Sequence, residues 1–112
     1  MRSLGIVGGR DFKNYDLLCR TLDALYFDTV VSGGADGADA LAERYAWDHG
    51  KKIKIFTADW TKYGRAAGPR RNKEIVEHSD GICAFWDGQS RGTASTIQFC
   101  QQAGKPIKIV NY

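Results

Sequence analysis

The sequence lacks long apolar runs and has few cysteines, and each shortage excludes a class of protein. No stretch approaches the roughly 20 apolar residues that a membrane-spanning helix needs. The apolar stretch before Gly8 is too short for a secretory signal. Three cysteines without a C-x-x-C pair (Cys19, Cys83 and Cys100) argue against a disulfide framework and a metal cluster. We therefore expect a cytoplasmic protein with no membrane partner and no bound metal, whose cysteines pack as small apolar residues.

The two common nucleotide-binding fingerprints are also missing. No G-x-x-x-x-G-K-[ST] motif occurs, which argues against a Walker-type NTPase. The first glycine-rich turn reads GGRDF from Gly8 onward and does not fit G-x-G-x-x-G. Asp28 lies near the position where dinucleotide-binding folds carry a ribose-binding acid, but the fingerprint before it is absent. NAD is therefore not expected, and no other cofactor is expected either.

Short apolar runs alternate with amphipathic segments along the chain. The predicted strands are 4–7, 29–32, 53–56, 82–86 and 106–110, and the predicted helices are 14–26, 38–46, 69–78 and 93–103. Continuous apolar strands between helices are typical of a parallel sheet that is covered on both faces. The prediction is one α/β domain over residues 1–112, a Rossmann-like three-layer α/β/α sandwich with a five-stranded, mainly parallel sheet. At this size a homodimer or homotetramer is expected.

Positive charge is concentrated in the second half of the chain. Residues 1–60 hold 8 basic and 9 acidic side chains, whereas residues 61–112 hold 8 and 4. Within 62–73 there is no acid, and the basic residues are Lys62, Arg65, Arg70, Arg71 and Lys73. Such a run is either a solvated surface or an anion site, because arginine pairs with phosphate in a planar two-point geometry.

Glycine is frequent where strands are predicted to end. Nine of the 13 glycines follow the first four strands: Gly8, Gly9, Gly33, Gly34, Gly37, Gly64, Gly68, Gly88 and Gly92. The carboxyl ends of parallel strands form the ligand-binding edge of an open α/β sheet. Glycine lets backbone N–H groups approach an anion there, and the helix that follows adds positive potential. The pattern predicts a phosphate-bearing or similar anionic small ligand.

Candidate binding residues follow the first two strands. They are Gly8, Gly9, Arg10, Asp11, Gly33, Gly34, Ala35, Asp36 and Asp39. Arg10 either reaches a phosphate or pairs with Asp11 or Asp36. Asp36 and Asp39 either cap the next helix or accept ribose hydroxyls.

A second group of candidates follows the third and fourth strands. They are Trp60, Arg70, Arg71, Asn72, Gly92, Thr93, Ser95 and Thr96. Arg70 and Arg71 are expected in the first turn of a helix, where cations are disfavoured and an anionic partner would explain them. Trp60 either stacks on a base or packs in the core. Thr93 either contacts a phosphate or caps its helix.

Five motifs in this order resemble a known family. They are GGRDF, SGGADGAD, ADW, AGPRRN and GTA, which begin at residues 8, 32, 58, 67 and 92. The string is similar to the small YspA/YpsA-related family of the SLOG superfamily, which also contains DNA processing protein A and the Lonely Guy enzymes. The resemblance covers about residues 3–110. It implies a Rossmann-like fold that binds nucleotides or nucleotide-derived ligands, in some members as a sensor beside an effector domain.

The same resemblance argues against one known activity. Lonely Guy enzymes cleave the N-glycosidic bond of nucleoside monophosphates and carry the signature P-G-G-x-G-T-x-x-E. The matching stretch here keeps Gly92 and Thr93 but has Thr96 at the position of the glutamate. A threonine hydroxyl cannot replace a carboxylate in that chemistry. No catalytic residue is therefore assigned.

Three functions remain open from the sequence. The first is a nucleotide-binding module that senses or sequesters its ligand. The second is a nucleotide hydrolase or transferase that uses Asp36, Asp39 or Asp59 as its carboxylate. The third is a single-stranded nucleic-acid binder that combines the basic segment 62–73 with Trp60 and Tyr63.

Overall fold

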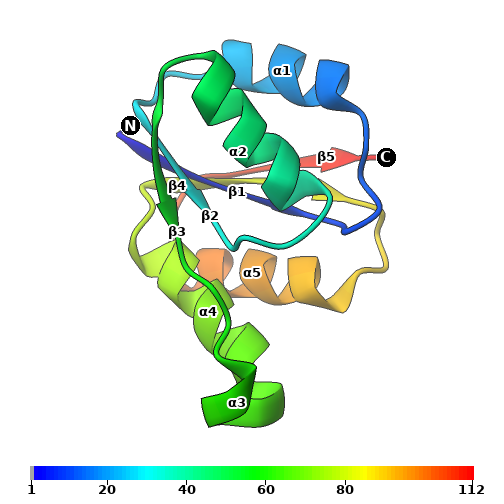
Figure 1. Ribbon diagram of the computed structural model, residues 1–112, viewed down its shortest axis with the longest axis vertical. Helices are drawn as coiled ribbons and strands as arrows, with labels where there is room; N and C mark the ends of the chain where they lie inside the picture. Colours follow the sequence, from blue (N-terminus) through cyan, green and yellow to red (C-terminus); the bar gives the residue numbers. More distant parts are fainter. Residues whose placement is uncertain (1) are drawn as a thin grey trace.

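The computed structural model describes residues 2–112, which form five strands interleaved with helices (Figure 1). The strands are β1 (Ser3–Gly8), β2 (Thr29–Ser32), β3 (Lys52–Ile55), β4 (Gly81–Trp86) and β5 (Ile107–Asn111). The helices are α1 (Tyr15–Asp23), α2 (Ala38–Asp48), α3 (Trp60–Tyr63), the 3-10 turn η1 (Gly64–Ala66), α4 (Ala67–Glu77) and α5 (Arg91–Gln102).

The five strands form one sheet in the order β3-β2-β1-β4-β5, and every neighbouring pair is parallel. Helices α1 and α2 cover one face and α4 and α5 cover the other, while α3 projects from the end of the molecule (Figure 1). The predicted Rossmann-like three-layer sandwich is confirmed. All the predicted strands are present, so the order of apolar runs was sufficient to predict the architecture.

The core divides into two parts because side chains alternate across the sheet. Towards α1 and α2 lie Leu4, Ile6, Cys83 and Phe85, which pack with Phe12, Leu18, Leu22 and Tyr45. Towards α4 and α5 lie Val7, Val31, Ile82 and Ala84, which pack with Ile75, Val76, Ile97 and Cys100. The sheet is thus buried on both faces over its three central strands.

Strands β3 and β5 differ from the prediction that all strands are covered on both faces. Every residue of β3 is exposed, with Ile53 40% and Ile55 45% accessible. Most of β5 is exposed as well, Ile109 to 39%. Both strands lie at the sides of the sheet, and a short apolar run does not reveal the position of its strand in the order.

The helix boundaries also correct the prediction from the sequence. The helix predicted over 69–78 begins at Ala67 and is preceded by α3 and η1, so Arg70 and Arg71 lie beyond its first three residues. The helix predicted over 93–103 begins at Arg91, and Ser90 caps it in place of Thr93. Helix α1 ends at Asp23, earlier than expected.

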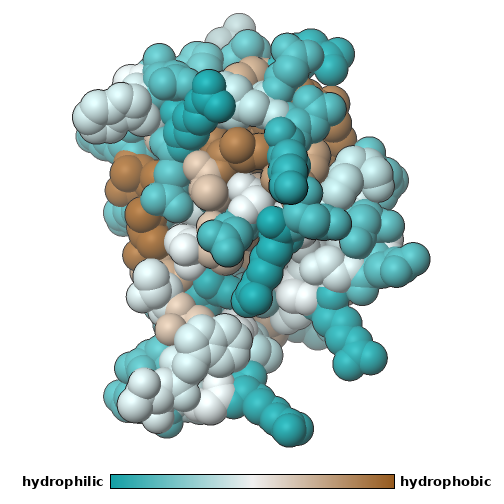
Figure 2. All heavy atoms as spheres, turned by 45° about the vertical axis from the view of Figure 1, so that its right-hand side comes forward, coloured by the Kyte–Doolittle hydropathy of each residue, from teal (hydrophilic) through white to brown (hydrophobic). Residues whose placement is uncertain are grey.

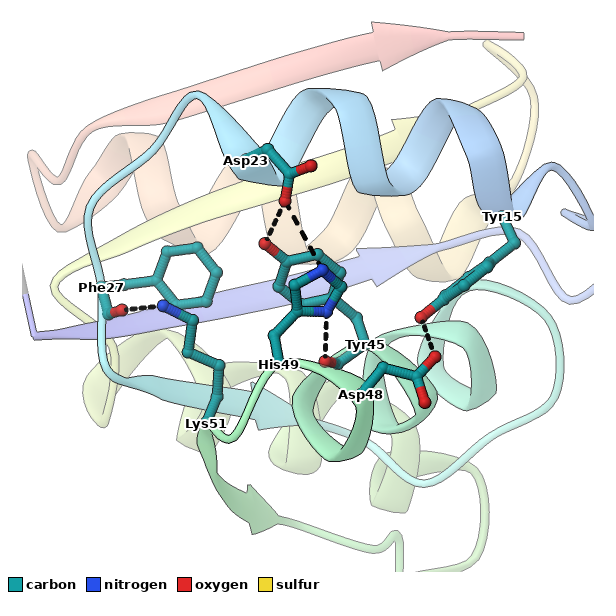
Figure 3. Close-up of polar contacts among 7 residues, drawn as sticks. All are labelled: Tyr15, Asp23, Phe27, Tyr45, Asp48, His49 and Lys51. Atoms are coloured by element: carbon teal, nitrogen blue, oxygen red, sulfur yellow. Dashed lines mark hydrogen bonds and ion pairs between the residues drawn. The ribbon is translucent and has the colours of Figure 1, made fainter.

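Polar contacts join α1 to α2 on the outer side of the sheet (Figure 3). The Tyr15 hydroxyl donates to Asp48 Oδ2 at 2.7 Å, and the Tyr45 hydroxyl donates to Asp23 Oδ1 at 2.7 Å. The His49 ring stacks on Tyr45 with centroids 3.9 Å apart, and its Nε2 lies 3.7 Å from Asp23 Oδ1. These contacts fix the two helices against each other.

Membrane-spanning helices, metal ligands and cysteines can be checked over the residues that the structure describes. No helix between residues 2 and 112 is both long and apolar enough to cross a membrane. Over the same range no group of three or more histidine, cysteine or acidic side chains is placed to hold a metal ion. Cys83 and Cys100 are buried as expected, whereas Cys19 is only half-buried. Burial raises the pKa of the Cys83 thiol to about 12, so this thiol is unreactive near neutral pH.

Candidate functional site

The loops that follow β1 and β2 are held together by their backbones. The Ala38 N–H at the start of α2 donates to the Gly9 carbonyl at 3.1 Å. Gly37, which precedes it, has φ +73°, and a Cβ added there would overlap Gly9 O and lie 2.5 Å from the Arg10 carbonyl carbon. Only glycine combines this backbone conformation with this close approach. The loop contact fixes one wall of a hollow at the carboxyl ends of the strands.

This hollow, called here the main cleft, has a volume of about 440 Å³. Its lining residues are Val7, Gly8, Gly9, Arg10, Asp11, Ala35, Asp39, Arg71, Asn72, Ile75, Asp87, Ser90, Gly92, Thr93 and Thr96. Figure 2 turns the right-hand side of Figure 1, where β5 ends, towards the viewer and shows hydrophilic side chains over much of this face with paler surface between them. The volume is within the range of small-molecule sites, about 300–1,000 Å³.

Arg71 reaches from α4 to the loop that follows β2 and lines the main cleft. Its Nη1 donates to the Gly33 carbonyl at 2.8 Å, and its Nε donates to Asn72 Oδ1 at 3.0 Å. Two of its N–H groups are thus used to fix the direction of the side chain, which is half-buried. The fork of a guanidinium has five donors, so others remain for a ligand.

The N-terminus of α5 forms the opposite wall. Ser90 caps this helix by accepting the Thr93 N–H at 3.4 Å. The Asn72 side-chain amide donates to the Gly92 carbonyl at 3.3 Å, which ties α4 to the first turn of α5. The Thr96 hydroxyl donates to the same carbonyl at 3.3 Å, and its side chain is buried. The helix therefore presents its N-terminal dipole to the main cleft.

Three carboxylates also line the main cleft, and each has a partner within the chain. Asp11 Oδ1 accepts the Tyr112 hydroxyl at 2.6 Å. Asp87 Oδ1 accepts the backbone N–H groups of Gln89 and Ser90 at 2.8 Å each. Those two hydrogen bonds lower the pKa of Asp87, because they favour its ionised form.

Asp39 is the buried member of this set, with only 6% of its surface accessible. Its Oδ2 accepts the Ala35 N–H at 3.2 Å. Burial raises the pKa of Asp39, and the Ala35 hydrogen bond and the charge of Arg71 oppose that shift only in part. Asp39 therefore ties the first turn of α2 to the loop before it, whereas Gly37 occupies the N-cap and neither Asp36 nor Asp39 caps this helix.

A second hollow of about 300 Å³, called here the side pocket, adjoins the main cleft. Its lining residues are Arg10, Gly33, Gly34, Ala35, Asp36, Thr57, Ala58, Trp60 and Arg71. Arg10, Ala35 and Arg71 line both hollows and form their common boundary. Trp60 stands on α3 with 53% of its surface accessible, and its ring lies over Gly68.

The two hollows contain most of the residues that the sequence singled out. All the predicted candidates except Arg70 and Ser95 line the main cleft or the side pocket. Arg70 instead lies with its guanidinium carbon 4.0 Å from the centroid of the Tyr63 ring, and Ser95 is a half-buried residue of α5. Of the two neighbouring arginines in α4, Arg70 therefore packs on the Tyr63 ring within the chain, whereas Arg71 lines both hollows.

Some lining residues were missed by the prediction from the sequence. Asp87 and Ser90 follow β4, and Thr57 follows β3. The D-x-x-S spacing between Asp87 and a helix start is a turn-and-cap signal that could have identified the first two. Trp60 was placed in a loop and lies in the short helix α3, which Asp59 caps by accepting the Lys62 N–H at 3.1 Å.

The fold and the cleft define a Rossmann-like α/β protein with a glycine-rich hollow at the carboxyl ends of its strands. The sequence model of the YspA, cpYpsA-related SLOG family (YAcAr) matches residues 5–63, and the chain belongs to this family. It is 37% identical over 118 residues to the Gene 61 protein of Mycobacterium phage D29, a match that covers 96% of this chain and 94% of that protein.

Solved structures of DNA processing protein A share the fold. The Streptococcus pneumoniae protein superposes with a TM-score of 0.75 at 17% identity over 97% of this chain. The Helicobacter pylori protein, whose single-stranded DNA binding mode has been studied, gives a TM-score of 0.73 at 19% identity over 96% of this chain. The chain spans only 50% and 64% of those two structures.

Proposed function

We propose that this protein binds a nucleotide or nucleotide-derived small ligand in the main cleft, with its phosphate between Arg71 and the N-terminus of α5. It would act as a sensor or would sequester the ligand. Membership of a SLOG family supports a nucleotide-related ligand. The arginine side chains and the helix N-terminus that line the main cleft support a phosphate group on that ligand.

The observation that carries the proposal concerns the ion pairs of the two arginines that line the main cleft, Arg10 and Arg71. Among residues 2–112 the ion pairs are Arg20–Asp16, Arg44–Asp48 and His49–Asp23, all on α1 and α2 or just beyond α2. Neither Arg10 nor Arg71 pairs with a carboxylate within the described chain. A half-buried guanidinium that makes no direct ion pair and lies near a helix N-terminus favours an anionic ligand.

The remaining polar groups fit the rest of a nucleotide. Asp11, Asp39 and Asp87 are acceptors that can each take a further hydrogen bond from a sugar hydroxyl. Val7 and Ile75 give the floor of the main cleft an apolar surface. A hollow with a few convergent polar groups on an apolar floor is typical of a small-molecule site.

Calorimetric titration with adenosine monophosphate tests the proposal. The variant Arg71→Met should weaken binding about tenfold or more, because charge-assisted hydrogen bonds to phosphate are lost. Arg70→Met is the matched control, since Arg70 is adjacent in sequence but packs on Tyr63, and it should bind like the parent protein. Equal loss in both variants, or no binding by the parent protein, would contradict the proposal.

The same samples decide between binding and catalysis. A sensor or sequestering protein returns the nucleotide intact, whereas a hydrolase releases base or phosphate over time. Asp39 is the carboxylate best placed for acid chemistry, because it is buried in the cleft and its pKa is raised. Thr96 donates its hydroxyl to the backbone of its own helix, which leaves it no role as a base. Turnover that is abolished in Asp39→Asn would make the protein an enzyme.

One observation favours single-stranded nucleic acid as a second candidate ligand. Helix α3 and η1 project from the sheet and carry Lys62 and Arg65 as exposed cations beside Arg70 (Figure 1). Lys62 Nζ lies 5.1 Å from the centroid of the Tyr63 ring. Binding through this surface would weaken steeply with salt and would strengthen with oligonucleotide length. Lys62→Met would then reduce oligonucleotide affinity and leave mononucleotide affinity unchanged.

A further inference from the structure

We infer that the ligand has two parts joined through phosphate, with one nucleoside in the main cleft and a second planar group against Trp60 in the side pocket. This inference rests on the proposed function, because it assumes that the main cleft holds a nucleotide phosphate. It adds the class of ligand, a pyrophosphate-bridged nucleotide in place of a mononucleotide.

The two arginines lie between the hollows. Arg10 and Arg71 line both the main cleft and the side pocket, so the two cationic side chains that line these hollows lie at the boundary between them. A ligand matched to this arrangement carries its anionic group in the middle and a group on either side. A mononucleotide carries its phosphate at one end and leaves one hollow empty.

The lining of the side pocket suits a flat group. Gly33, Gly34 and Ala35 form one wall with no bulky side chain, and the indole of Trp60 stands at another. The indole lies over Gly68, where an added Cβ would be 3.3 Å from its Cη2. Small residues beside a half-exposed, positioned aromatic ring suit a flat aromatic group, since bases stack on such rings.

The two hollows differ in their polar groups. The main cleft contains Asp39, Asp87 and the start of α5, which suit sugar hydroxyls and phosphate. The side pocket has a single carboxylate, Asp36, and contains no residue of α5. A nucleoside monophosphate therefore occupies the main cleft, and the side pocket selects for the second half of a longer ligand.

The test compares two ligands that carry the same base and the same charge at neutral pH. Adenosine monophosphate and diadenosine 5′,5′-pyrophosphate are titrated into the full chain and into Trp60→Ala and Trp60→Phe. The parent protein should bind the dinucleotide at least tenfold more tightly, which corresponds to about 1.4 kcal/mol. Trp60→Ala should abolish this advantage without changing the affinity for the monophosphate, and Trp60→Phe should keep most of it. Trp47→Ala, at an 88% exposed tryptophan of α2, is the matched control and should bind like the parent.

The outcomes separate this inference from the proposed function. If the monophosphate binds and the dinucleotide binds no more tightly, the two-part ligand is wrong and the proposed function stands. If Trp60→Ala weakens both ligands equally, the base of a mononucleotide already occupies the side pocket and the inference is again wrong. If neither ligand binds, both the inference and the proposed function are overturned.

Discussion

At the amino ends of the strands, lysine and aspartate side chains bond to the backbone of neighbouring loops, whereas at the carboxyl ends a backbone contact joins the first two loops and Arg10 faces the hollows. Lys105, just before β5, donates from Nζ to the carbonyls of Val76 at 2.7 Å and Ser79 at 2.8 Å. Lys51, just before β3, donates from Nζ to the Phe27 carbonyl at 2.8 Å. Both ammonium groups thus donate to backbone carbonyls and stabilise the fold.

Asp80 completes the pattern at the amino ends. Its Oδ2 accepts the backbone N–H groups of Arg2 at 3.0 Å and Ser3 at 2.9 Å, next to the start of β1. At the carboxyl ends, in contrast, Gly37 brings two loop backbones into contact. Because the backbone makes that contact, Arg10 is not needed to join the loops and is available to a ligand. We therefore assign a stabilising role to the amino ends of the strands and, under the proposed function, ligand binding to the carboxyl ends.

The largest expected effect comes from breaking the backbone contact at the carboxyl ends. Gly37→Ala should lower the free energy of unfolding by about 3 kcal/mol, because the new Cβ meets the Gly9 carbonyl and the backbone prefers glycine at φ +73°. Gly50→Ala has the same type of backbone strain at φ +65° but meets no atom within 4 Å, so it should cost about 1 kcal/mol. Denaturant unfolding measures both, and equal losses would show that the loop contact is unimportant.

The second largest effect tests the hydrogen bonds that Lys105 donates at the amino ends of the strands. Lys105→Met should lower the free energy of unfolding by about 2 kcal/mol, because the carbonyls at the end of α4 lose a charged donor. Lys108→Met removes an exposed lysine of β5 and should change stability by less than about 0.5 kcal/mol. Nucleotide affinity should be unchanged in both variants. A loss of affinity in Lys105→Met would mean that the two ends of the sheet are coupled.

The smallest effect is a difference in the sign of pH dependence between Asp39 and Asp80. The folded pKa of Asp39 is raised by burial, so its contribution to stability is greatest below pH 3.8 and is lost as pH rises through the folded pKa. The folded pKa of Asp80 is lowered by its bonds from Ser3 and Arg2, so its contribution is present above pH 3.8 and is lost as pH falls through the folded pKa.

Asparagine variants make this difference measurable. Relative to the parent protein, Asp39→Asn should become more stable as pH is raised from about 3.5 to 7, because ionisation of the buried carboxyl is no longer required. Asp80→Asn should become less stable over the same range. Thermal unfolding at several pH values gives both trends. The same sign for the two variants would contradict the opposite pKa shifts of these two carboxyl groups.

The fold could be predicted because its signals are local. Each strand of the sheet coincides with a short segment rich in apolar residues, although lysine alternates with isoleucine in β3, and each long helix follows a turn with its own capping or glycine signal. The exposure of β3 was missed, although the alternation of lysine and isoleucine over Lys52–Ile55 is typical of a strand at the side of a sheet. Helix α3 was also missed, since a single turn around Trp60 gives no periodic pattern.

The candidate site was predictable at its glycines and less so at its side chains. The rule that ligands bind at the carboxyl ends of parallel strands is enough to group Gly8, Gly33 and Gly92 from the sequence alone. It could not show that Arg71 faces the cleft while Arg70 packs on Tyr63, because adjacent helical residues point in different directions. The side pocket depends on the path of the chain after β3, for which the sequence has no comparable rule.

An NMR titration of ¹⁵N-labelled protein with adenosine monophosphate shows directly whether the carboxyl ends of the strands bind a nucleotide. We expect saturable shifts of the amide signals of Gly9, Gly33 and Gly92, at the carboxyl ends of three different strands. The amides of Asp80 and Lys105, at the amino ends, should stay in place. Shifts confined to α3 and η1, or an absence of saturable shifts at the three glycines, would contradict a nucleotide site in the main cleft.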